Sequence, residues 1–182
     1  MKPPFHNDDG GAYDCSLTSD NSVMRVLGID PGTRVTGYGV VEKQKNKLVN
    51  IMYGEVKPSK GAPLSTCLVT IYDQLMEVVE KTTPHAVAIE NIFYGKNVKS
   101  LIKQGETRGV TILVGSHKRI PVFEYTPLEI KKVVVGYGRA EKNQIQYMVK
   151  AILHLSELPP PDASDALAVA ICHAHFLKVS PI

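Results

Sequence analysis

The alternation of apolar and polar residues is regular from Met24 onward and divides this part of the chain into short strands and longer helices. Short runs of apolar or β-branched residues, bounded by turn formers such as Pro31 and Gly32, predict strands. Two of these runs are joined by the polar turn QKNK, as expected for a hairpin. The predicted strands are residues 25–30, 35–43, 48–57, 86–90 and 121–125.

Apolar residues that recur every three or four positions predict helices between and after these strands. The repeat is clear from Leu64 to Leu75, and Pro84 follows as a stop signal. A second segment contains Gly105 and Gly109, whose four-residue spacing predicts close helix packing. The predicted helices are residues 64–81, 97–118, 127–134, 141–155 and 162–177.

The order of these elements predicts an α/β fold with a five-stranded mixed sheet. Three strands in succession form an antiparallel meander, and the later strands join it through helical crossovers that make them parallel. The first and fourth strands then become parallel neighbours. Helices are expected on both faces of the sheet.

Residues 1–23 differ from the rest of the chain because they are polar and show no periodicity. This composition predicts a disordered N-terminal extension, followed by one domain over residues 24–182. No run approaches the roughly 18 unbroken apolar residues of a membrane helix. The three cysteines are scattered without a CxxC pair, which favours a reducing compartment and argues against a zinc site. We therefore expect a cytoplasmic protein without a membrane partner.

Positive charge is concentrated in the middle of the chain. The formal net charge is +3, but residues 91–150 contain eleven Lys or Arg against four Glu and no Asp. Such a basic region is typical of a protein with a polyanionic partner. A solvated, lysine-rich helical face explains the same count equally well.

Four acidic residues lie where the predicted topology brings chain segments together. Asp30 ends the first strand and Glu90 ends the fourth, and sites in open α/β sheets gather at the carboxyl ends of strands. Asp162 and Asp165 are three residues apart at the start of the last helix, and therefore on one face of it. If that helix packs across the same end of the sheet, the four carboxylates converge.

A cluster of four carboxylates needs cations, and hard oxygen ligands favour Mg²⁺ or Mn²⁺. Two Mg²⁺ ions roughly 4 Å apart would suit in-line displacement at a phosphodiester, one activating water and the other stabilising the leaving oxygen. Each acid also has a simpler explanation. Asp30 before Pro-Gly is typical of a turn, and Glu90 of a solvated strand end. Asp162 and Asp165 fit a helix N-cap with a first-turn acid.

Four longer motifs occur in order along the chain. They are VLGIDPGTRVTGYGV, AIENIFYGKN, PVFEYTPLEIKKVVVGYGRAEKNQI and DASDALAVAICHAH. Together they closely resemble the RuvC family of Holliday-junction resolvases, and the match runs from about Arg25 to about Phe176. The extension before Met24 is the one clear departure from the family pattern.

The resemblance implies an RNase H-like fold, a homodimer and symmetric nicking of two opposed strands at a four-way DNA junction. It places the family's four acidic positions, catalytic and metal-binding, on Asp30, Glu90, Asp162 and Asp165. A branch-migration helicase complex of the same pathway is the further partner that it implies.

A basic loop follows the second acid. Phe93 stands three residues after Glu90 and shortly before Lys96 and Asn97, so its ring is placed to stack on an unpaired junction base. The family carries a base-stacking Phe at this position. A core aromatic that anchors the loop is the simpler explanation.

Other residues are candidates for contacts with the DNA backbone. Lys131 and Lys142 match family lysines that approach the backbone near the scissile phosphate, although surface lysines are common on any helix. Thr33 and Arg34 flank the first acidic turn and are further candidates for phosphate contacts.

Three other functions compete with junction cleavage. GIDPGT also resembles the first phosphate loop of sugar-kinase and actin-type ATPases, but the chain is too short for the duplicated domain of those proteins. An RNase H-like nuclease acting on RNA ends would share the four acids. A junction-binding module without catalysis would gain nothing from four acids that repel phosphate.

Overall fold

The computed structural model describes residues 23–91, 98–138 and 141–176. Its described strands are β1 (Val23–Asp30), β2 (Thr36–Gln44), β3 (Lys47–Val56), β4 (Ala86–Glu90) and β5 (Val122–Tyr125). Its described helices are α1 (Leu64–Thr82), α2 (Val98–His117), α3 (Pro127–Val135), α4 (Lys142–Ile152) and α5 (Pro161–Phe176).

Every predicted strand and helix is present, and the bounds of each agree to within three residues. One boundary needs correction: Val23 is the first residue of β1 and pairs with Gln44, so it does not belong to the predicted extension. The rest of that extension lies outside the described residues. None of the helices in the described ranges is long and apolar enough to cross a membrane.

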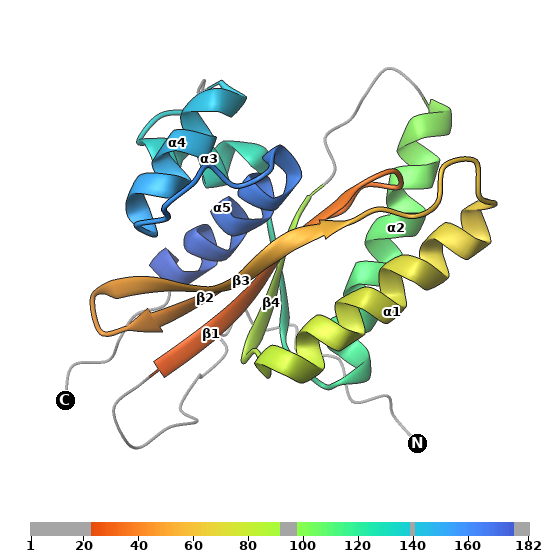
Figure 1. Cartoon of the computed structure of the whole chain (residues 1–182), viewed down its shortest axis with the longest axis horizontal. Helices are drawn as coiled ribbons and strands as arrows, with labels where there is room; N and C mark the ends of the chain where they lie inside the picture. The colour runs from red at the N-terminus through yellow and green to blue at the C-terminus, as the bar shows by residue number, and fades with distance from the viewer. Residues whose placement is uncertain (1–22, 92–97, 139–140, 177–182) are drawn as a thin grey trace, which may run out of the picture.

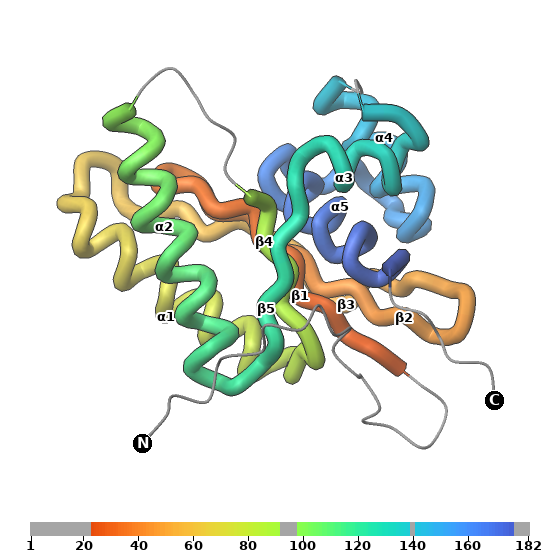
Figure 2. The backbone as a smooth tube through the Cα atoms, turned by 180° about the vertical axis from the view of Figure 1, so that it is seen from behind, coloured from red at the N-terminus to blue at the C-terminus, as the bar shows by residue number. Residues whose placement is uncertain are grey.

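The sheet is mixed, with the strand order β3-β2-β1-β4-β5. Strands β1, β2 and β3 form the predicted antiparallel meander, while β4 and β5 run parallel to β1. Helices α1 and α2 cover one face of the sheet, and α3, α4 and α5 cover the other (Figures 1 and 2). The predicted five-stranded sheet with helices on both faces is therefore confirmed.

Helix α5 is buried almost throughout, because it lies between the sheet and the pair α3 and α4. Its apolar residues surround the helix instead of forming one stripe, as expected for a central helix. Glycines in the sheet allow α5 to lie directly on it. A Cβ atom at Gly28 would lie 2.1 Å from the backbone oxygen of Ala166, and one at Gly37 would lie 1.9 Å from that of Asp162. Close backbone contact thus fixes the position of the start of α5.

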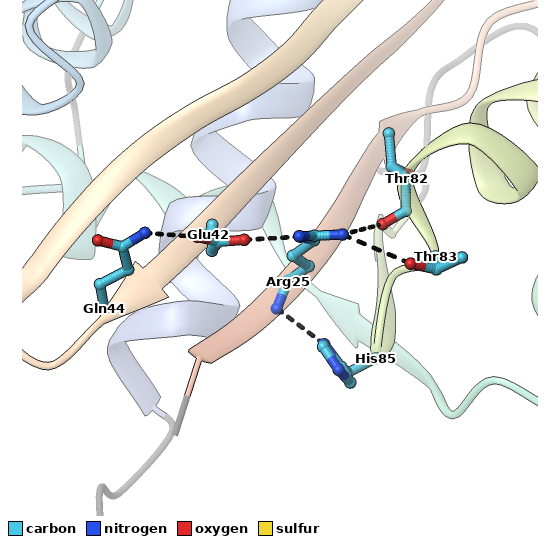
Figure 3. A network of polar contacts seen from close by, with 6 residues as sticks. All are labelled: Arg25, Glu42, Gln44, Thr82, Thr83 and His85. Atoms are coloured by element: carbon cyan, nitrogen blue, oxygen red, sulfur yellow. Dashed lines mark hydrogen bonds and ion pairs between the residues drawn. The ribbon is translucent and has the colours of Figure 1, made fainter. Parts of the chain in front are cut away.

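The N-terminal end of β1 is held by a polar network around Arg25 (Figure 3). Its Nε atom donates to Glu42 at 2.6 Å, and its Nη1 atom donates to the carbonyl of Thr82 at 2.9 Å. Gln44 donates to the second oxygen of Glu42 at 2.6 Å, while the backbone of Arg25 pairs with His85. Because a terminal carbonyl of α1 needs a donor from outside the helix, Arg25 joins α1 to the sheet.

Candidate active site

The first acid stands at a tight turn that follows β1. Asp30 is the last residue of that strand, and the hydroxyl of Thr36 closes the turn by donating to the carbonyl of Gly32 at 2.7 Å. Gly32 has no room for a side chain, since its Cβ would lie 2.2 Å from the carbonyl oxygen of Val35. The turn is therefore fixed by local contacts, and it holds Asp30 at the carboxyl end of the sheet.

The second acid is placed by the parallel pairing of β1 and β4. Ile29 lies in register with Ile89, so Asp30 and Glu90 follow at adjoining strand ends. Both residues are half-buried. The predicted juxtaposition of these two acids is confirmed.

The last two acids come from the start of α5. Gly37, over which the backbone of Asp162 lies, is the cross-strand partner of Asp30. The loop before the helix is anchored at Pro159, whose carbonyl accepts hydrogen bonds from Gln146 at 2.7 Å and Ser164 at 3.2 Å. These contacts position the first turns of α5 beside the end of β1.

All four acids line one cleft of about 440 Å³. Lys131 of α3 and Lys142 of α4 line the same cleft from the side opposite the sheet. The structure therefore brings together residues that are far apart in the sequence, as the predicted topology required.

The acids at the strand ends are deprived of ordinary solvation. Burial, followed by repulsion from Asp165 and Asp162, raises the pKa of Asp30 from 3.8 to about 7. Burial, followed by repulsion from Asp30, raises the pKa of Glu90 from 4.5 to about 8. At neutral pH the pair retains protons unless a cation displaces them.

The lysines of the cleft compensate only part of this charge. The Nζ atom of Lys142 lies 3.1 Å from Oδ2 of Asp165, and this contact raises the pKa of the lysine. Lys131 and Lys142 both act to lower the pKa of Glu90, but burial and Asp30 outweigh them. The side chain of Lys142 is 76% exposed, so it is accessible to a polyanion.

The other residues predicted to contact DNA differ in their surroundings. The hydroxyl of Thr33 lies 3.1 Å from that of Thr107 on α2, so this group is already engaged within the protein. Arg34 is exposed beside the turn. Phe93, Lys96 and Asn97 lie outside the described residues.

One acid beside the site was missed by the sequence analysis. Glu55 of β3 pairs across the sheet with Gly37, and burial, followed by repulsion from Glu55, raises the pKa of Asp162. Its carboxylate also forms an ion pair with Lys57, with Nζ and Oε2 2.5 Å apart. The sequence held no signal for this contact, because an acid near the end of an edge strand is ordinary.

The donor set fits a hard divalent cation. Within the described ranges, no three His, Cys, Asp or Glu side chains form a ready-made cage for one metal ion. Mg²⁺ seldom uses such cages, since it takes one or two carboxylates and completes its shell with water and phosphate oxygens. Carboxyl oxygens from four residues that line one cleft match that preference.

Comparison with known proteins gives consistent matches. The family model described as crossover junction endodeoxyribonuclease RuvC matches residues 26–173. A protein of that name from Syntrophotalea carbinolica is 53% identical over 159 residues, which cover 87% of this chain and 99% of the relative. Another, from Caldanaerobacter subterraneus, is 52% identical over 153 residues, covering 84% of this chain and 93% of the relative.

Solved structures agree with these sequence matches. Thermus thermophilus RuvC in complex with a Holliday junction substrate has a TM-score of 0.79 and 34% identity, covering 84% of this chain and 94% of that chain. The yeast mitochondrial Holliday junction resolvase has a TM-score of 0.59 at 16% identity, covering 82% and 77%, and so supports the fold alone. These likenesses confirm the predicted RNase H-like architecture.

Proposed function

This chain belongs to the RuvC family of crossover junction endodeoxyribonucleases, and we propose that it resolves four-way DNA junctions by nicking two opposed strands. The observation that carries the proposal is the cleft in which Asp30, Glu90, Asp162 and Asp165 meet beside two lysines. A site of this charge repels phosphate unless it also holds cations, so it is suited to hydrolysis rather than to passive binding.

We propose that the four carboxylates hold Mg²⁺, two ions per site, with Mn²⁺ as a substitute. When bound, the ions would supply activation of water and stabilisation of the leaving oxygen. Asp30 and Glu90 must give up their protons to serve as ligands, because burial and repulsion from neighbouring acids raise the pKa of both. Lys142 and Lys131 would contact a DNA phosphate at the rim of the cleft. These contacts would hold the DNA backbone over the four acids.

We further propose that the enzyme works as a homodimer through α2. Val98, Ile102 and Leu113 are 67%, 57% and 52% exposed on this helix, although all are large apolar residues. Gly105 and Gly109 lie between them at helical spacing, and nothing stands within 4 Å of where their Cβ atoms would be. The close helix packing expected from these glycines is therefore available to a second copy, and two active sites would serve two strands.

The same proposal extends to the cellular setting. A homodimer that cuts junctions would act in the cytoplasm with the branch-migration helicase complex of its pathway, as the family resemblance implies. Family membership decides against the ATPase alternative. A nuclease for RNA ends and a non-catalytic junction binder are less favoured, and the substrate assay below separates them.

The direct test uses a synthetic four-way DNA junction with each strand labelled in turn. With Mg²⁺, we expect paired nicks at symmetric positions in two opposed strands, while linear duplex DNA and RNA ends stay intact. Without divalent cations, the junction should be bound but not cut. Binding without cleavage in both Mg²⁺ and Mn²⁺ would instead favour the binding module.

A further inference from the structure

The cleft of the four acids has two different walls. Lys131 and Lys142 line it from α3 and α4, which cover one face of the sheet. Gln104 lines it from α2, which covers the other face (Figures 1 and 2). Within the described residues, no Lys or Arg lines the cleft on the side of Gln104. The cleft therefore has a basic wall and a wall without cations.

The turn after Asp30 fixes the part of α2 that carries Gln104. Lys103 directly precedes Gln104, and its carbonyl accepts hydrogen bonds from two hydroxyls. Thr33 donates one of them at 3.4 Å and Thr107 donates the other at 3.1 Å. The two hydroxyls also lie 3.1 Å apart. Because Thr33 belongs to the turn that holds Asp30, the same contacts position Asp30 and Gln104 relative to each other.

Gln104 lies on the face of α2 that is turned toward the rest of the fold. Thr107 and Thr111 follow it after three and seven residues on the same face, and both are fully buried. Gly109, on the face proposed for the dimer, follows after five residues and therefore lies about 140° away around the helix. A second copy packed on that face would leave Gln104 open to the cleft.

The amide of Gln104 is available to a ligand. Gln104 is half-buried, and within the described residues its side chain forms no hydrogen bond or ion pair. A glutamine amide offers one carbonyl acceptor and two N–H donors. It can use both kinds at once on a single base edge, as in the bidentate contact of Gln with adenine. The lysines of the opposite wall carry the charge that attracts phosphate instead.

We propose that Gln104 is a specificity-determining residue that hydrogen-bonds to a nucleobase beside the scissile phosphate. This inference rests on the proposed function, which places that phosphate over the four acids. The DNA backbone is attracted to the basic wall, so the attached nucleoside lies toward the wall of Gln104. Base contacts carry sequence information, whereas phosphate contacts only position the DNA. Cleavage should therefore depend on the base that Gln104 contacts.

The test uses four-way junctions with a fixed branch point and a mapped cut site. The base pair on either side of that site is varied in turn through all four possibilities. At one of the two positions, wild type should cut the best junction at least about fivefold faster than the worst, since one bidentate base contact discriminates by about 5–150-fold. Gln104→Ala should bring these four rates to within about twofold of one another.

Two further variants sharpen the result. Gln104→Glu keeps the length of the side chain but can only accept hydrogen bonds, so it should reorder the four rates in favour of bases that donate. Gln74→Ala is the matched control, because Gln74 is an exposed helical glutamine of α1 that does not line the cleft. It should keep the wild-type preference. Melting temperatures establish that each variant is folded.

Several outcomes would overturn the proposal. They are equal rates of wild type on all the junctions, and retention of the wild-type order by Gln104→Ala or Gln104→Glu. Calorimetry without DNA should give Gln104→Ala the Mn²⁺ affinity of wild type, and a loss of affinity would make Gln104 a metal ligand instead. Asn91 also lines the cleft. A preference that is lost in Asn91→Ala but kept in Gln104→Ala would assign the base contact to Asn91.

These measurements separate the inference from the function on which it rests. If wild type cuts none of the junctions in Mg²⁺ or Mn²⁺, the proposed function fails and the inference fails with it. If wild type cuts junctions and Gln104→Ala keeps the same base preference, only the inference fails.

Discussion

Strand β1 meets carboxylates at both of its ends, and the protein treats them differently. At the start, Glu42 receives Arg25 on one oxygen and Gln44 on the other, and these hydrogen bonds lower its pKa (Figure 3). At the end, Asp30 and Glu90 form no ion pair within the described residues, and burial raises the pKa of each. The first end is complete by itself, while the second is the end at which we propose that metal ions bind.

The contrast separates two uses of buried charge. A carboxylate that is paired inside the protein joins segments, as Glu42 does through Arg25 to the end of α1. A carboxylate left without an ion-pair partner, with a raised pKa and an oxygen free for a cation, instead marks a candidate functional site. Variants at the two ends should therefore fail in different assays.

The largest effect is expected from single changes at the four acids. Each variant should bind a four-way junction at least as tightly as wild type, because phosphate contacts come from Lys and Arg. Each should cut junctions more than about 100-fold more slowly than wild type. Even the mutation of a residue that only hydrogen-bonds to a metal ligand typically lowers metal affinity or activity by about 10–100-fold. The variants are Asp30→Asn, Glu90→Gln, Asp162→Asn and Asp165→Asn.

Gel shift and cleavage on one protein preparation measure both properties. Arg25→Ala serves as the control from the other end of β1, because it lies outside the cleft and should cut normally per folded molecule. Normal cleavage by any of the four acid variants would remove that acid from the catalytic set.

The pH dependence of stability should have opposite signs at the two ends. The folded state keeps a proton on Asp30 up to pH about 7, whereas the unfolded chain releases it near 3.8. The metal-free protein should therefore lose unfolding free energy as the pH rises through this window, and Glu90 extends the loss toward pH about 8. Glu42, whose pKa is lowered, contributes stability that is lost as the pH falls through its folded pKa.

Urea unfolding of the metal-free protein between pH about 5 and about 8 measures the slope caused by Asp30 and Glu90, while the slope caused by Glu42 is measured at lower pH. In the double variant Asp30→Asn/Glu90→Gln, the free energy of unfolding should decline less with pH. In wild type, Mg²⁺ should raise the free energy of unfolding most at the alkaline end of the window, where the proposed ligands are ionised. A stability that increases with pH over the whole window in wild type would contradict the assignment.

Breaking the network at the start of β1 should lower stability without changing the chemistry. Arg25→Ala leaves the carboxylate of Glu42, which is 7% exposed, without its cation. Removing one partner of a buried ion pair lowers the free energy of unfolding by about 3–5 kcal/mol. Because Arg25 is 35% exposed, we expect a smaller loss of roughly 2 kcal/mol. Lys81→Ala, which breaks the exposed pair with Glu77, is the control, and equal losses would show that the network adds nothing.

The smallest effect is expected at the rim of the cleft. Lys142→Gln should weaken junction binding several-fold and lower the slope of log affinity against log salt by about one. Lys150→Gln removes the same charge from the same helix, away from the cleft, and should change the slope less. Equal slopes for the two variants would place Lys142 outside the DNA contact.

Much of this architecture was predictable from local patterns. Strands and helices followed the apolar periodicity, and the parallel crossover from β1 to β4 sufficed to place Asp30 beside Glu90. Asp162 and Asp165 joined them because α5 is apolar on all sides and must lie against the sheet. These are consequences of short-range order combined with a topology that allows few alternatives.

Other features depend on contacts that no local pattern encodes. A β-bulge, in which Ile51 is an extra residue of β3 opposite β2, decides on which face of the sheet the side chain of Glu55 lies. Nothing in the sequence of β3 predicts this bulge. The contact between Thr33 and Thr107 joins a turn to a helix more than seventy residues away, so Thr33 could be predicted only as a residue near phosphate. Roles in catalysis and DNA binding stay predictions for every residue of the site.

The close seating of α5 on Gly28 and Gly37 also has a consequence for the growing chain. Translation produces Asp30 and Glu90 well before Asp162 and Asp165, which arrive with the last described element. A partly made chain therefore holds only half of the acids, and the cleft closes around all four only after α5 docks. On the proposed function, junction cleavage by a new chain therefore begins only after its final helix has docked on the sheet.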